Sequence, residues 1–121
     1  MVVLYAVDPI HVAPFYEAVA GFTRGKSSAG YVLLQTGSEE IDIVRVSAEI
    51  AEGIALSDPP EPREDNPIKP TFNVESIEAA RAAAVGTGGE IYPVEHEWEF
   101  RDHIVCNGVD PEGNVIQVRQ R

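Results

Sequence analysis

Apolar side chains recur along residues 9–20 with the spacing of one helical face. They occupy the i, i+3, i+4 and i+7 positions Val12, Phe15, Tyr16 and Val19. Asp8 can accept hydrogen bonds from the free amides of the first turn, and Gly21 is a typical left-handed stop. The pattern predicts a helix over 9–20. Pro14 conflicts with it, because proline deep in a helix costs about 3 kcal/mol, so we expect the regular helix to begin only near Val12, after a looser turn.

A second helix is predicted over residues 77–85. Ser76 is a good N-terminal cap, and the alanines that follow favour helix strongly. The shared apolar face consists of Ile77, Ala80 and Ala84. The glycine-rich run at 86–89 follows the helix and lacks the lysine and hydroxyl residue of a phosphate loop, so it is interpreted as a stop.

Shorter apolar runs bounded by turn residues predict strands. They lie at about 1–7, 30–36, 40–47, 69–74, 90–94, 103–109 and 114–120. The segment Asp110-Pro111-Glu112-Gly113 predicts a tight turn before the last strand, because Asp caps it, Pro presets φ and Gly accepts the left-handed position.

Two segments of the chain resemble each other and indicate a duplication. Residues 5–10 align with residues 72–77 at an offset of 67, and each segment is a strand end followed by a helix start. The sequence therefore predicts one domain over 1–121. Its first module covers about 1–47 and its second about 68–121, and a linker rich in Pro, Asp and Glu covers about 48–67.

Composition narrows the classes of function. The net charge of −11 repels nucleic acid and anionic membranes, and it favours a cationic ligand, although solubility alone would also explain it. No apolar run approaches the roughly 20 residues that span a bilayer. The one cysteine, Cys106, lies in an apolar run and is expected to be a packed strand residue rather than a nucleophile. A cytoplasmic location is expected from the lack of a signal peptide and of a cysteine pair.

Several motifs together resemble the glyoxalase/bleomycin resistance protein/dioxygenase (vicinal oxygen chelate) superfamily. They are Val7-Asp8, Phe15-Tyr16, Gly21-Phe22, Val74-Glu75-Ser76-Ile77 and the closing hairpin Asp110-Pro111-Glu112-Gly113-Asn114. The resemblance covers nearly the whole chain. It implies an α+β fold in which two βαβββ modules form a curled mixed sheet around a cavity, with the helices on the outside. It also implies that two copies of the chain form a homodimer.

The resemblance also implies where metal ligands would lie. Metal-dependent members have a His near the start of each module's first strand and a Glu or Gln on its last strand. Those positions map here to Val2, Lys69, Asp42 and Gln117, with Arg45 as the alternative to Asp42 in an ungapped register. Valine has no donor atom and an ammonium group repels a cation, so too few ligands remain for a divalent site. We therefore expect no metal and no cofactor.

The histidines offer one alternative metal site. His96 lies among acidic residues in Val94-Glu95-His96-Glu97-Trp98-Glu99, and His103 follows shortly after it. If the segment is extended, His96 and Glu97 point to opposite faces, and the three glutamates share one face. A solvated acidic loop is the simpler interpretation of the segment.

Strand alternation suggests which residues line the cavity. Lys69, Thr71 and Asn73 share one face of a strand and Phe72 shares the other with Val74, a mixed polar face that suits a wet cavity or an exposed edge strand. By the repeat, the residues expected to face the cavity in the first strand are Val2, Leu4 and Ala6.

A second candidate cluster is Trp98, Phe100 and Arg101. These residues would stack on a planar ligand and pair with its anionic group, or simply cover the core. Lys69 has two alternatives as well, because it could bind an anionic group or pair with Asp42 across the cavity.

The function expected from these features is the binding of a small, cationic or aromatic organic ligand without metal. One alternative is a metal-dependent lyase, isomerase or dioxygenase of the same superfamily. Another is a non-catalytic structural or interaction domain. Fold alone does not separate the three, because one superfamily supports many chemistries.

Overall fold

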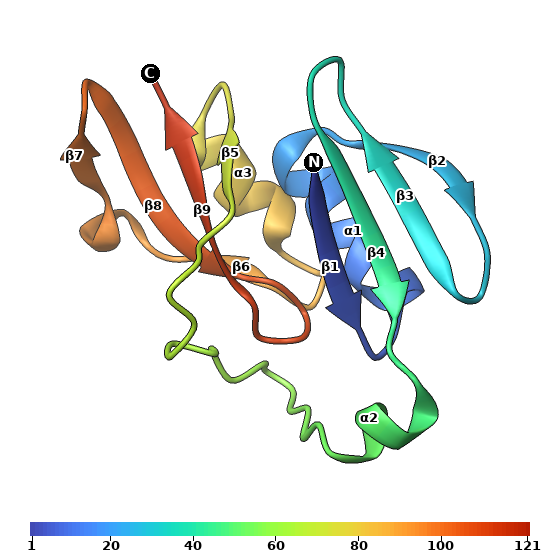
Figure 1. Ribbon diagram of the computed structural model, residues 1–121. Helices are drawn as coiled ribbons and strands as arrows, with labels where there is room; N and C mark the ends of the chain where they lie inside the picture. The colour runs from blue at the N-terminus through green and yellow to red at the C-terminus, as the bar shows by residue number, and fades with distance from the viewer.

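The structure is a computed structural model that describes residues 1–121 (Figure 1). Its elements, in chain order, are β1 (Val2–Ala6), α1 (Pro9–Ala20), β2 (Thr23–Ser27), β3 (Tyr31–Gln35), β4 (Glu40–Arg45), α2 (Ala48–Glu52), β5 (Thr71–Asn73), α3 (Ile77–Ala84), β6 (Glu90–Ile91), a 3-10 turn η1 (Val94–His96), β7 (Trp98–Phe100), β8 (His103–Val109) and β9 (Val115–Gln120). None of the helices is long and apolar enough to cross a membrane.

The strands form two mixed sheets that lie side by side (Figure 1). Sheet A has the order β1-β4-β3-β2, and its only parallel pair is β1 with β4. Sheet B has the order β5-β9-β8-β6, with β7 also paired to β8, and its only parallel pair is β5 with β9. Each half thus repeats the same parallel contact between its first and last strands. The α+β fold inferred from the sequence is confirmed.

The core lies between the two sheets and the helices α1 and α3, which contact each other. Four aromatic rings form edge-to-face contacts at its centre, with centroid separations of 5.1–5.8 Å, namely Phe15, Tyr16, Phe22 and Phe72. Such pairs stabilise a core by roughly 0.5–1.5 kcal/mol each beyond the area that they bury. Cys106 is fully buried in the same cluster, as expected of a packed strand residue.

Helix α1 begins at Pro9, so the expected late start near Val12 is wrong. The amide of His11 donates to Asp8 Oδ1 over 3.4 Å, and Gly21 adopts φ 71° at the C-terminal end. Pro14 lies inside the helix on its exposed side. Water can therefore hydrogen-bond the carbonyl of Ile10, which has no amide partner at residue 14.

Replacing Pro14 with alanine is expected to raise the free energy of unfolding by about 1–2 kcal/mol, because the substitution restores one helical hydrogen bond at an exposed position. Urea denaturation measures the change. Pro9→Ala is the matched control and should give no gain, since the first amides of a helix have no partner. An unchanged or lower stability of Pro14→Ala would contradict this explanation.

Helix α3 confirms the second predicted helix, although it ends one residue earlier, at Ala84. The Ser76 hydroxyl accepts from the amide of Ala79 over 3.1 Å. The two N-terminal caps, Asp8 and Ser76, are 68 residues apart, whereas the sequence alignment used an offset of 67. The structural repeat is thus shifted by one residue from the aligned one.

This shift reverses the expected faces of β1. Leu4 packs against the core and Ala6 is 1% exposed, whereas Val3 and Tyr5 are 49% and 64% exposed. The prediction that Val2, Leu4 and Ala6 face the cavity is therefore wrong. Side chains alternate along a strand, so an error of one residue moves every side chain to the opposite face.

Several elements were not predicted from the sequence. These are β2, α2, η1 and β7. The residues of β2 are all exposed, and α2 buries none of its residues, so neither has the apolar periodicity that identifies an element. The turn at 110–113 is confirmed, with Gly113 at φ 88°.

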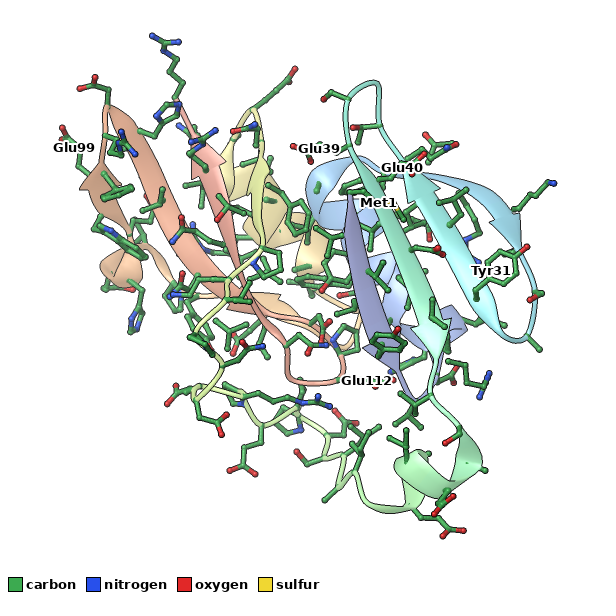
Figure 2. All side chains as sticks on the ribbon, in the orientation of Figure 1. Met1, Tyr31, Glu39, Glu40, Glu99 and Glu112 are labelled. Atoms are coloured by element: carbon green, nitrogen blue, oxygen red, sulfur yellow. The ribbon has the colours of Figure 1, made fainter.

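That turn also joins the two halves of the molecule through its carboxylates. Glu112 is 4% exposed and accepts hydrogen bonds from the amides of Val7 and Asp8, over 2.7 and 2.8 Å. Figure 2 shows its position beside the end of β1. Asp110 is fully buried and accepts from the Tyr16 hydroxyl over 2.7 Å. The closing hairpin of the second half therefore fixes the β1–α1 junction of the first.

Candidate functional site

Each sheet has one face that is not packed on α1 or α3, and the two faces together are called the open face below. Residues of the open face alternate with core residues along β1, β3, β4, β5 and β9, and the register of the sheets extends the assignment to β7 and β8. The predicted ligand-binding residues that lie in strands on this face are Asp42, Thr71, Asn73, Trp98, Phe100 and Gln117.

On sheet B, the predicted alternation of β5 is confirmed. Phe72 is 4% exposed, and its neighbours Thr71 and Asn73 are exposed. Thr71 lies opposite Gln117 of β9 and Asn73 lies opposite Arg119. Arg119 Nε donates to Asn73 Oδ1 over 2.9 Å. This part of the open face is therefore a row of amide, hydroxyl and guanidinium groups.

On sheet A, Asp42 lies opposite Val3 in the parallel pair of β1 and β4. The pair of Thr71 and Gln117 occupies the corresponding place in sheet B. The registers thus make Asp42 the structural counterpart of Gln117, whereas Arg45 lies opposite Ala6. The structure does not bring Asp42 into an ion pair with Lys69.

The aromatic residues of the second predicted cluster lie on β7, at an edge of sheet B. Trp98 and Phe100 are 41% and 53% exposed. Trp98 lies opposite Val105 of β8, which is fully buried although it lies outside the main core cluster. We infer that the indole covers this valine and presents its other side to solvent.

Arg101 lies in the two-residue turn between β7 and β8. Its φ is 50° and that of Asp102 is 65°. Positive φ at both central residues defines the type I′ turn, whose twist matches that of the flanking strands. The backbone of Arg101 therefore shapes the hairpin, and its exposed side chain extends from the end of the β7–β8 hairpin.

Lys69 lies in a cavity of about 340 Å³ between sheet B and the segment that leads into β5. The other residues that line it are Arg63, Glu64, Asn66, Pro67, Tyr92, Asn107 and Val115. Two backbone bonds of 2.8 Å hold the segment on the sheet, from Arg63 N to the Gly113 carbonyl and from Gln117 N to the Pro70 carbonyl. The cavity thus brings Lys69 together with residues that are distant from it in sequence, such as Tyr92 and Asn107.

Sequence reasoning missed Arg63, Asn66, Tyr92 and Asn107 as candidate ligand-binding residues. Asn107 was open to prediction, because it alternates with the buried Cys106 along β8 and so faces the same side as Gln117. The Gln117 amide indeed donates to Asn107 Oδ1 over 3.4 Å. The other three depend on how the linker folds back onto the sheet, which no local pattern indicates.

The residues at the family's metal positions do not fit a divalent metal. With the corrected offset, the counterpart of Lys69 is Met1, and the family's metal positions on the last strands hold one carboxylate at Asp42 and one amide at Gln117. These two lie on different sheets. No group of three His, Cys, Asp or Glu side chains in the structure is arranged to hold a metal ion. Three or four such donors are needed for a typical site.

The histidine alternative is not assembled either. His96 lies beside the ring of Tyr92, at 5.8 Å between centroids, and His103 Nδ1 lies 2.9 Å from the Arg101 carbonyl. Glu97 does not belong to a solvated loop, because it forms a 2.6 Å ion pair with Arg81. The interpretation of this segment as a fully solvated acidic loop is therefore wrong at Glu97.

Arg81 also contacts the buried thiol of Cys106, over 3.9 Å. Burial raises the pKa of Cys106, and the nearby guanidinium only partly opposes that change. The thiol donates to the Tyr92 carbonyl over 3.4 Å. A buried, protonated thiol is a poor nucleophile, so the cysteine has a packing role.

A family comparison identifies the fold. The model of the glyoxalase-like domain family matches residues 1–119. The chain belongs to this family. No curated protein matches the chain significantly.

Solved structures share the glyoxalase-like fold at low sequence identity. A glyoxalase/bleomycin resistance protein/dioxygenase family enzyme from Burkholderia phytofirmans PsJN has a TM-score of 0.70 and 20% identity, over 98% of this chain and 94% of that one. The fosfomycin resistance protein FosX from Mesorhizobium loti has 0.66 and 10%, over 99% and 88%. The bleomycin-binding protein from Streptomyces verticillus, complexed with copper(II)-bleomycin, has 0.62 and 18%, over 100% and 94%.

Proposed function

We propose that this protein binds a small organic ligand with a flat apolar part on its open face, and that binding needs no metal at the family's usual positions. The observation that carries the proposal is the number of large apolar side chains that the open face leaves in contact with solvent. They are Val3, Tyr5, Tyr31, Trp98 and Phe100, which are 38–64% exposed.

Such a face is unusual for a sheet that only meets water. Strands with one solvated face normally present polar side chains to solvent. Here exposed apolar side chains gather in two places, Val3, Tyr5 and Tyr31 on sheet A and Trp98 with Phe100 on β7, and such groups mark interaction sites. Aromatic side chains interleaved with a few amide and charged groups are typical of pockets for organic molecules. The amides of Asn107 and Gln117 provide the polar groups in sheet B.

Two structural neighbours support the choice of ligand class. One is complexed with copper(II)-bleomycin, and the other is named for resistance to fosfomycin. From these two neighbours we take only that the proposed ligand is a small molecule. The ligand proposed here is aromatic, and Asp42, at the centre of sheet A, is the group that would attract a positive charge on it.

We propose that two copies of the chain form a homodimer that completes this site. The support is that Val3 and Tyr5, on the first strand of the open face, are about half exposed or more in the single chain. Sedimentation velocity measures the association state. A chain that stays monomeric at high concentration would contradict the proposal.

Trp98 is the only tryptophan, so its fluorescence reports directly on the proposed site. Proflavine, a flat aromatic cation, is expected to quench Trp98 emission equally before and after treatment with EDTA. Phe100→Ser should weaken binding about tenfold, because Phe100 lies on β7 with Trp98 and its loss removes an aromatic contact with about 1.4 kcal/mol of binding free energy.

Ile10→Ser is the matched control, since Ile10 is 51% exposed on α1, away from the open face, and its loss should not affect binding. A lack of quenching would overturn the proposal. So would quenching that requires added Zn²⁺, Mn²⁺ or Ni²⁺, or a stoichiometric, tightly held divalent ion in the purified protein.

A further inference from the structure

The cavity beneath the linker contains two cationic side chains, Arg63 and Lys69. The chain has 9 basic and 20 acidic residues, so most basic groups would be expected to have an acidic neighbour. The three ion pairs of the structure are Arg24–Glu17, Arg45–Asp8 and Arg81–Glu97. Neither cation of the cavity is paired. Glu64, the one acidic side chain in the lining, forms no ion pair with either of them.

The neutral polar groups of the cavity are arranged as donors. Asn66 Oδ1 accepts from the amide of Ile68 over 3.0 Å, and Asn107 Oδ1 accepts from Gln117 over 3.4 Å. Both asparagines therefore use their oxygens within the protein and keep their NH₂ groups for other partners. The phenol of Tyr92 is a further donor, and burial together with the nearby carboxylates of Glu90 and Glu64 raises its pKa.

The lining thus combines a guanidinium, an ammonium, two amide NH₂ groups and a phenol with one carboxylate, that of Glu64, so donors and positive charges outnumber acceptors. Such a set complements the oxygens of an anion, because charge-assisted hydrogen bonds to carboxylate or phosphate are about twice as strong as neutral ones. We propose that this cavity binds a carboxylate- or phosphate-type oxyanion, as the anionic end of the organic ligand. The inference rests on the proposed function and adds a ligand class that the negative net charge does not suggest.

The test compares 2-naphthoate with 2-naphthamide, which differ in charge but hardly in shape. Two-dimensional ¹H–¹⁵N NMR spectra follow the amides of Lys69 and Asn107 during each titration. Naphthoate is expected to bind about tenfold more tightly than naphthamide, and inorganic phosphate should shift the same amides, because each charged hydrogen bond contributes about 1.4 kcal/mol or more.

The double variant Arg63→Gln/Lys69→Gln should bind naphthoate no better than naphthamide. Both substitutions keep the backbone, including the bond from residue 63 to the Gly113 carbonyl, and melting curves check the fold. Lys26→Gln is the matched control. Lys26 is exposed on β2, so its substitution removes one positive charge, as each substitution of the double variant does, but leaves the cavity unchanged.

Equal binding of naphthoate and naphthamide would overturn the anion site. So would a double variant that retains the preference, or phosphate shifts that fall outside the cavity or do not occur. Quenching of Trp98 by proflavine is measured separately, so the anion site can fail while the proposed function stands. The reverse result, an anion site without proflavine binding, would leave an oxyanion site and reject the aromatic ligand.

Discussion

Replacing Asp110 with alanine is expected to lower the free energy of unfolding by about 3–5 kcal/mol, the largest effect of any substitution discussed for this protein. The carboxylate is fully buried and accepts four hydrogen bonds. They come from the hydroxyl of Tyr16, the amide of Glu112, and the amide and side chain of Asn114. Its removal leaves these buried donors without partners, each at a cost of about 1–3 kcal/mol.

Chemical denaturation followed by circular dichroism measures the loss. Tyr16→Phe removes only one of the four bonds and should cost about 1–2 kcal/mol. Asp65→Ala is the charge-matched control, because Asp65 is exposed, and it should change stability by less than about 0.5 kcal/mol. An Asp110→Ala variant as stable as Asp65→Ala would show that the buried network does not hold the hairpin.

The Asp110 effect should also depend on pH. Burial raises the pKa of Asp110 above its usual value, although its hydrogen bonds oppose the change. The folded state therefore binds this proton more tightly than the unfolded state does. The stability contributed by the group is fully present below the unfolded pKa and is lost as the pH rises through the folded pKa. The free energy of unfolding of the wild type minus that of Asp110→Asn should thus become more positive as the pH is lowered from neutral, because only the wild type gains stability from binding this proton. A difference that shrinks would contradict the raised pKa.

Replacing Gly89 with alanine is expected to lower the free energy of unfolding by about 3 kcal/mol, the second large effect. A Cβ at this position would lie 2.5 Å from the Val109 carbonyl oxygen and 2.6 Å from Phe15 Cδ1. The first contact is with backbone and the second with a fully buried ring, so neither can yield without disturbing the core.

Gly37→Ala is the matched control, because a Cβ there meets nothing within 4 Å. It should leave stability unchanged or raise it by up to about 1 kcal/mol, since alanine restricts the unfolded chain. Thermal unfolding distinguishes the two variants. If both melt together, the close approach of Gly89 to Val109 and Phe15 is not a constraint on the fold.

The functional variants test a different property from these stability variants. Asp110 and Gly89 hold together the helices and the closing hairpin, whereas Arg63 and Lys69 lie in the cavity beneath the linker. We expect the cavity variants to retain the stability of the wild type and to lose only ligand preference. That separation is what distinguishes a binding site from a structural cluster of charges.

The sequence by itself determined the existence of the two long helices α1 and α3, their N-terminal caps and the turn at 110–113. Each depends on interactions within a few residues, such as the Ser76 hydroxyl with the amide of Ala79 or the positive φ of Gly113. The alternation of Phe72 with Thr71 and Asn73 was predicted correctly for the same reason. The family followed from these motifs taken together.

Only the tertiary structure decided which side of β1 faces the open face, and which residues surround Lys69. An alignment error of one residue exchanges the two faces of a strand, and the burial of Leu4 and Ala6 in the folded chain shows which face of β1 meets the core. Arg63 and Tyr92 approach Lys69 because the linker docks on the Gly113 carbonyl. Contacts between segments distant in the chain have no local pattern, so the sequence predicted the two long helices and most of the strands but not this cavity.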